Sequence, residues 1–321
     1  MKKWALWADI LLLLTACIWG FGFVAQRSGM EYVGPFAFNG IRFILGSLSL
    51  LPLIIWRKRE GTIQEAIPAA LIAGTCVFFG VTLQQLGMIF TTAGNAGFIT
   101  GLYVVLTPIF GIFLGRKTKP ATWIGMVFTF IGLYFISAAG NLNEINPGDI
   151  IIAVGAVFWT FHVLLIDRLV KKIDPIVLSS GQFFFCGLFS LVAAFLIEPF
   201  LAGWLSGLLQ TTGLLEWTPF PALLKGLLTG TIAIELVSGA IIPILFGGLA
   251  SVGIAYTLQV IAQKDAPPAH ATIILCLEGC FAALGGIILL HEPLGTWTIF
   301  GFSLMLTGML VSQWGTIIGK K

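Results

Sequence analysis

Ten apolar segments, each 18–24 residues long, are the feature that most limits how this chain can fold. A helix of about 20 apolar residues is long enough to cross the hydrocarbon core of a bilayer. Only 10% of the 321 residues are charged, far below the roughly 25% typical of a soluble domain. The sequence therefore predicts an all-α polytopic membrane protein with transmembrane helices at 8–25, 35–55, 67–90, 95–115, 121–139, 149–166, 176–197, 240–261, 269–290 and 296–317.

The basic residues indicate how these segments are oriented, because cytoplasmic loops carry an excess of Lys and Arg. If both termini are cytoplasmic and the segments alternate, 14 of the 17 basic residues fall in cytoplasmic stretches. Arg42 then lies inside a span, and Arg27 and Lys225 remain at the outer side. This asymmetry predicts ten spans with both termini on the cytoplasmic side.

The chain also repeats itself, which predicts two units at 1–140 and 141–321. Matches at an interval of 140 include Trp19 with Trp159 and Pro35 with Pro175, and matches at 175 include Thr82–Gln84 with Thr257–Gln259. Each unit has five spans, an odd number, so the two copies are expected to have opposite orientations. Inverted repeats of this kind place a substrate site around a central cavity near the bilayer midplane.

The difference between the two intervals indicates an insertion of about 35 residues, at about 198–239 in the second repeat. Two short apolar stretches in it are broken by Thr218, Pro219, Phe220 and Pro221. We interpret them as interfacial amphipathic helices on the outer face. The alternative is that both stretches cross the membrane, which would preserve the topology and raise the count to twelve.

Glu278 is the candidate site residue with the strongest signal, because it sits near the middle of the apolar segment 269–290. A carboxylate at that depth costs at least about 2.5 kcal/mol, so it normally faces a polar cavity or a partner within the helix bundle. The alternative is that Glu278 only holds neighbouring helices together through a hydrogen bond.

Two further kinds of residue lie deep enough to line the cavity. Arg42 is about seven residues into its span, where it either faces the cavity or extends to the outer headgroups. Trp19 and Trp159 occupy matching mid-span positions, which favour cavity lining or helix packing over a place at the interface.

Hydrogen-bonding side chains complete the candidate set. Gln84, Gln85 and Gln259 lie late in their spans, and Asn95, Thr100 and Tyr103 share another. Such groups either bind an amphiphilic solute or bond across helices. His162 could carry a proton or serve a structural role. Pro108 removes a backbone hydrogen bond and is predicted to kink its helix.

Several stretches resemble the drug/metabolite transporter superfamily, and specifically its EamA-type permeases. They are Ile18–Gly20, Arg42–Phe43, Thr91–Tyr103 with Pro108, Gly253–Gln259 and Leu277–Glu278. The resemblance covers nearly the whole chain and implies a ten-helix basket that moves small metabolites or drugs across a bacterial-type inner membrane. It also adds Tyr256, within the fourth stretch, to the cavity candidates. Two departures stand out: Gly279 replaces a Pro usual after the Glu, and the 198–239 insertion is long.

These observations favour a secondary transporter that exports amino-acid-like or amphiphilic solutes by alternating access, with a proton as a conceivable coupling ion. The sequence has no GxxxxGK[ST] motif for ATP hydrolysis and neither HExxH nor GxSxG. An intramembrane enzyme and a membrane receptor or scaffold remain the rival classes. We expect no cofactor, no metal site and no nucleic-acid partner, and the oligomeric state stays open.

Overall fold

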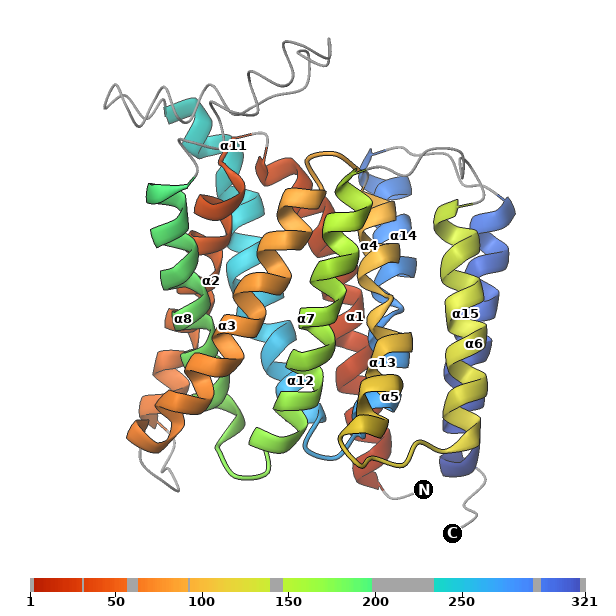
Figure 1. Ribbon diagram of the computed structural model, residues 1–321. Helices are drawn as coiled ribbons and strands as arrows, with labels where there is room; N and C mark the ends of the chain where they lie inside the picture. Colours follow the sequence, from red (N-terminus) through yellow and green to blue (C-terminus); the bar gives the residue numbers. More distant parts are fainter. Residues whose placement is uncertain are drawn as a thin grey trace.

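The computed structural model describes residues 3–30, 32–56, 63–91, 93–138, 147–197, 234–290 and 296–317. Within these ranges the chain is helical and has no strand. The helices stand side by side along one common direction, and the first begins at the same end of the bundle where the last finishes (Figure 1). The predicted insertion lies outside the described residues, except for 234–239, which open a helix.

The first half of the chain supplies six helical elements. They are α1 (Lys3–Met30), α2 (Pro35–Trp56), α3 (Ile63–Gly87), α4 (Ala93–Thr100), α5 (Tyr103–Phe113) and α6 (Pro120–Ala138). Proline opens several helices of the chain, where its fixed φ suits the first helical position and its missing N–H costs nothing.

The second half supplies the remaining elements. They are α7 (Pro147–Leu169), α8 (Pro175–Leu196), α11 (Ile234–Leu245), η2 (Phe246–Tyr256), α12 (Thr257–Ala262), α13 (Pro268–Leu275), α14 (Glu278–Leu290) and α15 (Thr296–Ile317). Asp174 shows how sequence sets such a start: its Oδ1 accepts the backbone N–H of Ile176 at 2.9 Å, just before α8 begins at Pro175.

In the described part of the chain, seven helical stretches are long and apolar enough to cross a membrane: Leu6–Met30, Pro35–Trp56, Ala66–Gly87, Pro147–Leu169, Pro175–Leu196, Gly239–Ala262 and Pro268–Leu289. Three further apolar stretches are shorter, Tyr103–Phe113, Pro120–Gly132 and Ile299–Ser312. Leu, Ile, Phe and Val side chains cover the outer surface of the bundle, as lipid contact requires. The prediction of an all-helical polytopic membrane protein is thus confirmed.

Two of the predicted spans are each broken into a pair of short helices. One break falls at Gly101 and Leu102, between α4 and α5, and the other at Cys276 and Leu277, between α13 and α14. The second break exists although Gly279 stands where a proline was expected. The first break lies before Pro108, and α5 continues through that residue as a helix. A bend of α5 at Pro108 therefore stays a prediction.

The element η2 is an 11-residue π-helix between α11 and α12. The turns of a π-helix are wider than those of an α-helix, so some of its backbone carbonyls can accept hydrogen bonds from a neighbouring helix. Two of them accept hydrogen bonds from α1: Thr15 Oγ1 donates to Ala255 O at 3.0 Å, and Trp19 Nε1 donates to Ser251 O at 3.2 Å. The π-helix thus ties α1 to the middle of the bundle.

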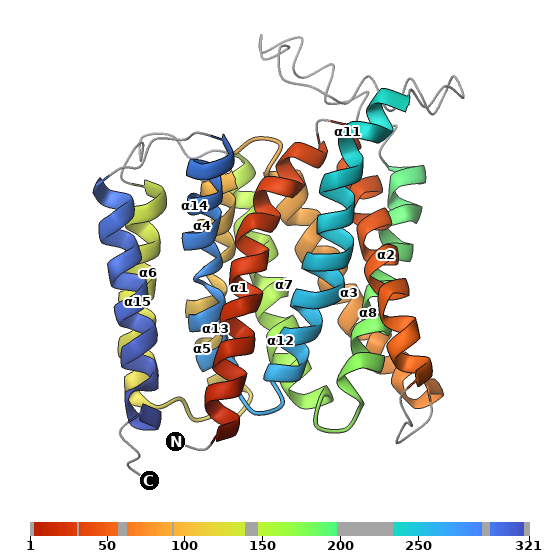
Figure 2. The same ribbon diagram turned by 180° about the vertical axis from the view of Figure 1, so that it is seen from behind.

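Paired helices form the two edges of the bundle, α2 with α8 and α6 with α15 (Figures 1 and 2). In the second pair, glycines allow backbone contact. A Cβ at Gly125 would lie 2.5 Å from Gly308 O, and a Cβ at Gly132 would lie 2.6 Å from Gly301 O. Small residues at helix crossings are typical of membrane bundles, where close packing drives association.

Candidate functional site

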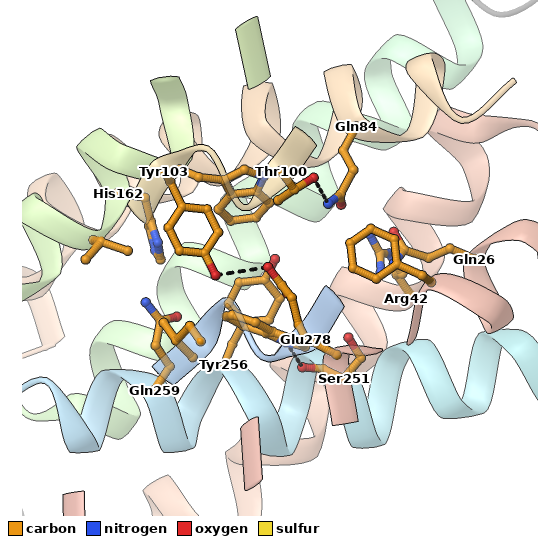
Figure 3. A pocket seen from close by; sticks show the side chains of 15 residues that line it. Gln26, Arg42, Gln84, Thr100, Tyr103, His162, Ser251, Tyr256, Gln259 and Glu278 are labelled. Atoms are coloured by element: carbon orange, nitrogen blue, oxygen red, sulfur yellow. Dashed lines mark hydrogen bonds between the residues drawn. The ribbon is translucent and has the colours of Figure 1, made fainter. Parts of the chain in front are cut away.

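A cavity lies in the middle of the bundle, lined by residues from both halves of the chain (Figure 3). Ten of the residues that the sequence singles out as candidates line it. The full lining is Trp19, Phe23, Gln26, Arg42, Gln84, Thr100, Tyr103, Trp159, His162, Val163, Ser251, Tyr256, Gln259, Leu275 and Glu278.

Glu278 and Tyr103 meet at the centre of this cavity. Tyr103 Oη donates a hydrogen bond to Glu278 Oε1 at 2.9 Å, and both side chains are buried. Each is the first residue after a helix break, Tyr103 in α5 and Glu278 in α14. The N-terminus of α14 also favours negative charge at Glu278 through the helix dipole. The breaks therefore bring a hydroxyl and a carboxyl group together at the point where the two broken helices face each other.

Arg42 is the second ionisable residue of the cavity, and it is only 2% exposed. Its Nε donates to Asn39 Oδ1 at 2.9 Å, and its guanidinium lies over the rings of Phe38 and Phe43 at 5.5 and 5.0 Å. Among the described residues no carboxylate forms an ion pair with it. A buried guanidinium with free N–H groups facing a cavity is suited to bind a carboxylate through a bidentate pair of hydrogen bonds.

Aromatic rings form one wall of the cavity around Tyr256. Its ring centroid lies 4.4 Å from that of Trp19 and 5.9 Å from those of Trp159 and Phe43. Trp19 and Trp159 both face the cavity, so neither is at the membrane interface. Such rings offer a flat apolar surface and can also attract a cation over their faces.

The remaining predicted residues supply amide and imidazole groups. Gln84 Nε2 donates to Thr100 Oγ1 at 2.9 Å, and Gln259 Nε2 donates to Gln263 Oε1 at 2.8 Å. His162 Nε2 lies 2.9 Å from Gln182 Oε1. Of the other polar candidates, Gln85 is buried outside the lining, and the side chain of Asn95 is outside the described part.

The cavity is small in this structure. It leaves about 40 Å³ for the centre of a water-sized molecule, which corresponds to roughly three waters. Binding sites for small molecules usually measure about 300 Å³ or more. A solute larger than a few waters can therefore enter only if the surrounding helices move apart.

Five lining residues were not singled out from the sequence: Phe23, Gln26, Val163, Ser251 and Leu275. Phe23, Val163 and Leu275 are apolar and do not differ from lipid-facing neighbours in type. Gln26 follows the predicted end of the first span, whereas α1 continues to Met30. Val163 had one available signal, because it lies next to the candidate His162.

A larger hollow of about 340 Å³ opens at the end of the bundle where α1 begins. Asp9 Oδ1 lies 2.8 Å from His270 Nε2 there, and Ser312 Oγ lies 3.4 Å from His270 Nδ1. This series of Asp, His and Ser side chains resembles the catalytic triad of a hydrolase in composition. However, Ser312 Oγ donates its proton to Met309 O at 2.8 Å. The contacts therefore link α1, α13 and α15 and do not prepare a nucleophile.

A second ion pair joins the α5–α6 connection to α7 near the same hollow. Arg116 pairs with the buried Asp167 of α7, and Lys171 reaches the same carboxylate at 3.3 Å. Within the described residues, no group of three or more His, Cys, Asp and Glu side chains could hold a metal ion.

Comparison with known proteins gives a consistent set of similarities. The profile of the EamA-like transporter family matches residues 6–138 and again 146–313. An uncharacterized transporter of Archaeoglobus fulgidus is 29% identical over 95% of this chain and 85% of its own length. The uncharacterized transporter YoaV of Bacillus subtilis is 22% identical over 94% of each chain.

Two further similarities bear on location and fold. The protein named uncharacterized inner membrane transporter YedA, from Escherichia coli, is 26% identical over 45% of this chain and 48% of its own. A solved crystal structure superposes with a TM-score of 0.74, covering 98% of this chain and 99% of that chain. At 16% sequence identity this second likeness concerns the fold alone.

Proposed function

This chain belongs to the EamA-like transporter family, and we propose that it exports amino-acid-like or amphiphilic solutes by alternating access. It is a multi-pass membrane transporter with two copies of the family's repeat. In the proposed mechanism the solute crosses unchanged, without ATP and without catalysis, and the chain lies in a bacterial-type inner membrane. The relative named as an inner membrane transporter supports that location.

We further propose ten crossings arranged as two inverted units, 1–140 and 141–321, with both termini cytoplasmic. The two helix breaks support this arrangement, since they fall at equivalent positions: Gly101 and Cys276 differ by 175, as do Tyr103 and Glu278. Cys276 Sγ also lies 3.3 Å from Gly101 O, so the equivalent breaks touch. Positions that contact their own equivalents are expected along a pseudo-two-fold axis.

The α6–α15 pair supports the same symmetry. Gly125 and Gly301 are equivalent positions of the two repeats, and so are Gly132 and Gly308, because each pair is 176 positions apart. In the structure Gly125 faces Gly308, and Gly132 faces Gly301. Each residue thus contacts the equivalent of the other, which is the pattern of a two-fold interface.

The observation that carries the proposed function is the origin of the cavity lining. Both repeats contribute to it in equivalent pairs, among them Trp19 with Trp159 and Gln84 with Gln259. A cavity shared between two units can be opened to either side when the units rock against each other. Its small volume fits an occluded state between the two openings.

The ionisable lining residues favour the solute class. Arg42 suits a carboxylate, Glu278 suits an ammonium group, and the rings around Tyr256 suit an apolar body. Glu278 is also the residue that we propose for coupling to a proton, since it alone among the lining residues carries a carboxyl group.

Flux into sealed proteoliposomes tests this proposal. Purified protein is reconstituted, and labelled amino acids and cationic amphiphiles are followed with and without an imposed pH gradient. We expect movement of unaltered solute that depends on the protein and needs no ATP. Chemical conversion of the solute, or no protein-dependent flux of either class, would contradict it. A growth-protection screen over toxic amino-acid analogues then narrows the solute and shows the direction.

A further inference from the structure

Three buried polar atoms at one end of the central cavity have no hydrogen-bond partner among the described residues. They are Trp159 Nε1, His162 Nδ1 and Gln259 Oε1, and all three residues line the cavity. Their exposed fractions are 8%, 1% and 1%. A buried polar group without a partner costs roughly 1–3 kcal/mol, so polar atoms of this kind beside a cavity need a partner that the cavity can hold, either ordered water or a solute.

The opposite ends of two of these side chains are held in place, which fixes what the free atoms can do. Gln259 Nε2 donates to Gln263 Oε1, and Gln263 Nε2 donates in turn to Val163 O at 3.0 Å. His162 Nε2 donates to Gln182 Oε1, so Nδ1 of the neutral ring is an acceptor. The cluster therefore offers one donor, the Trp159 indole N–H, and two acceptors.

The first repeat provides an internal comparison for the indole, because the equivalent indole N–H there is satisfied within the protein. Trp19 Nε1 donates to Ser251 O, a carbonyl of the π-helix. The first-repeat equivalent of Ser251 is Cys76, and its carbonyl lies in the regular helix α3. Gln84 Nε2 and Gln259 Nε2 both have acceptors, but Leu275, the equivalent of Thr100, offers no polar group beside Gln259. The position equivalent to His162 is Gly22.

The cluster is separate from the charged end of the cavity. Figure 3 shows His162 and Gln259 on one side of the Tyr103–Glu278 hydrogen bond and Arg42 with Gln26 on the other. The Trp159 and His162 ring centroids are 5.9 Å apart, which places the indole beside the imidazole. A solute whose carboxylate lies at Arg42 would therefore direct its other end toward this cluster.

We propose that Trp159, His162 and Gln259 form a subsite that binds a primary carboxamide at the end of the transported solute. The carboxamide oxygen accepts the indole N–H, and its two N–H groups donate to His162 Nδ1 and Gln259 Oε1. One acceptor and two donors are the complement of the cluster. This assignment rests on the proposed transport of amino-acid-like solutes and adds to it the identity of the solute's side chain.

The subsite should discriminate strongly against an apolar side chain of the same shape. A site built around hydrogen bonds rejects an analogue that cannot make them, because its own polar groups are then left unpaired. L-glutamine carries the carboxamide, and L-homoleucine has the same length and branching without polar atoms. The two compounds therefore separate carboxamide recognition from simple filling of the space.

The test is ligand-induced thermal stabilisation of the purified full chain, titrated with L-glutamine, L-glutamate and L-homoleucine. We expect L-glutamine to bind at least about tenfold more tightly than L-homoleucine, with L-glutamate also weaker, since a carboxylate has no N–H to donate. Equal affinities for the three would overturn the subsite, because water would then satisfy the cluster, while leaving amino-acid transport intact. Binding of none would overturn both proposals.

Variants then locate the effect. Trp159→Phe keeps an aromatic ring and removes the N–H, and Gln259→Leu removes the acceptor. Each should weaken L-glutamine binding roughly 3- to 10-fold and leave L-homoleucine binding nearly unchanged. Trp297→Phe, at an exposed ring of α15, is the matched control and should alter neither. If Trp159→Phe weakens both ligands alike, the indole acts by packing and the assignment fails.

Discussion

Tyr103 and Glu278 share a hydrogen bond of 2.9 Å and are 175 positions apart, the interval that also relates Gln84 to Gln259. Equivalent positions of the two repeats are thus in direct contact at the centre of the cavity. One carries a hydroxyl group that donates and the other a carboxyl group that accepts. The two residues thus occupy equivalent positions but carry different chemical groups. Because only Glu278 carries a carboxyl group, it is the first residue to test.

Glu278→Gln should fold nearly normally and transport poorly. The amide keeps the size and still accepts from Tyr103, but it loses the charge that would bind an ammonium group or carry a proton. Hydrogen bonds to charged groups contribute about 1.5–3 kcal/mol, so flux per folded molecule should fall about tenfold or more. The measurement is proteoliposome flux, normalised to monodisperse protein, across a range of pH.

Glu278→Leu is the companion variant, since it removes the polar group altogether. If Glu278 only joined helices, both variants would act through stability, Leu more than Gln, with unchanged flux per folded molecule. Wild-type flux from Glu278→Gln at every pH would show that no charge at Glu278 is needed.

Arg42→Gln should selectively weaken solutes that carry a carboxylate. The substitution copies Gln182, the equivalent residue of the second repeat, and removes a buried guanidinium that has no carboxylate partner in the described residues. We expect roughly a 10- to 100-fold loss of affinity for amino acids, corresponding to charged hydrogen bonds of about 1.5–3 kcal/mol. Amino-acid amides, which lack the carboxylate, serve as the comparison in the same binding assay. An equal loss for acids and amides would mean that Arg42 does not bind the carboxylate.

Gly132→Ala should destabilise the protein by about 1–3 kcal/mol through overpacking. Its Cβ would lie 2.6 Å from Gly301 O and 2.9 Å from the backbone N of Met305, and these backbone atoms cannot yield as the nearby Met305 side chain can. The readout is the midpoint of thermal unfolding in detergent. Gly111→Ala is the control, because its nearest neighbour there is the Arg116 side chain at 3.7 Å. That variant should be neutral or slightly stabilising, and a similar loss in both would refute the packing argument.

The orientation can be tested with single cysteines in a background without the native ones. Lys119, before α6, and Thr296, at the start of α15, lie at opposite ends of the bundle and are exposed. We expect an impermeant thiol reagent added outside intact cells to label Thr296→Cys and to leave Lys119→Cys unmodified until the membrane is opened. Labelling of both from one side would contradict the inverted arrangement.

The sequence predicts helix positions well because each helix is also an apolar run with a proline or polar boundary. Trp19, Arg42 and Glu278 could be selected in advance, since large or charged groups in mid-span have few uses. Phe23 and Leu275 could not, because an apolar side chain that faces the cavity looks the same in sequence as one that faces lipid. The π-helix at Phe246–Tyr256 was also missed, since it follows from packing against α1 and α2 and not from local propensity.

Phe43 and Phe183 are 140 positions apart and lie opposite each other in α2 and α8, with tilted rings whose centroids are 6.1 Å apart. In an ancestral dimer of two identical short chains, one mutation at this position would alter both sides of the contact at once. Joining the copies in a single gene releases that constraint, so each side can change alone. Tyr103 opposite Glu278 then represents a position where the two copies have already diverged, and Phe43 opposite Phe183 one where they have not.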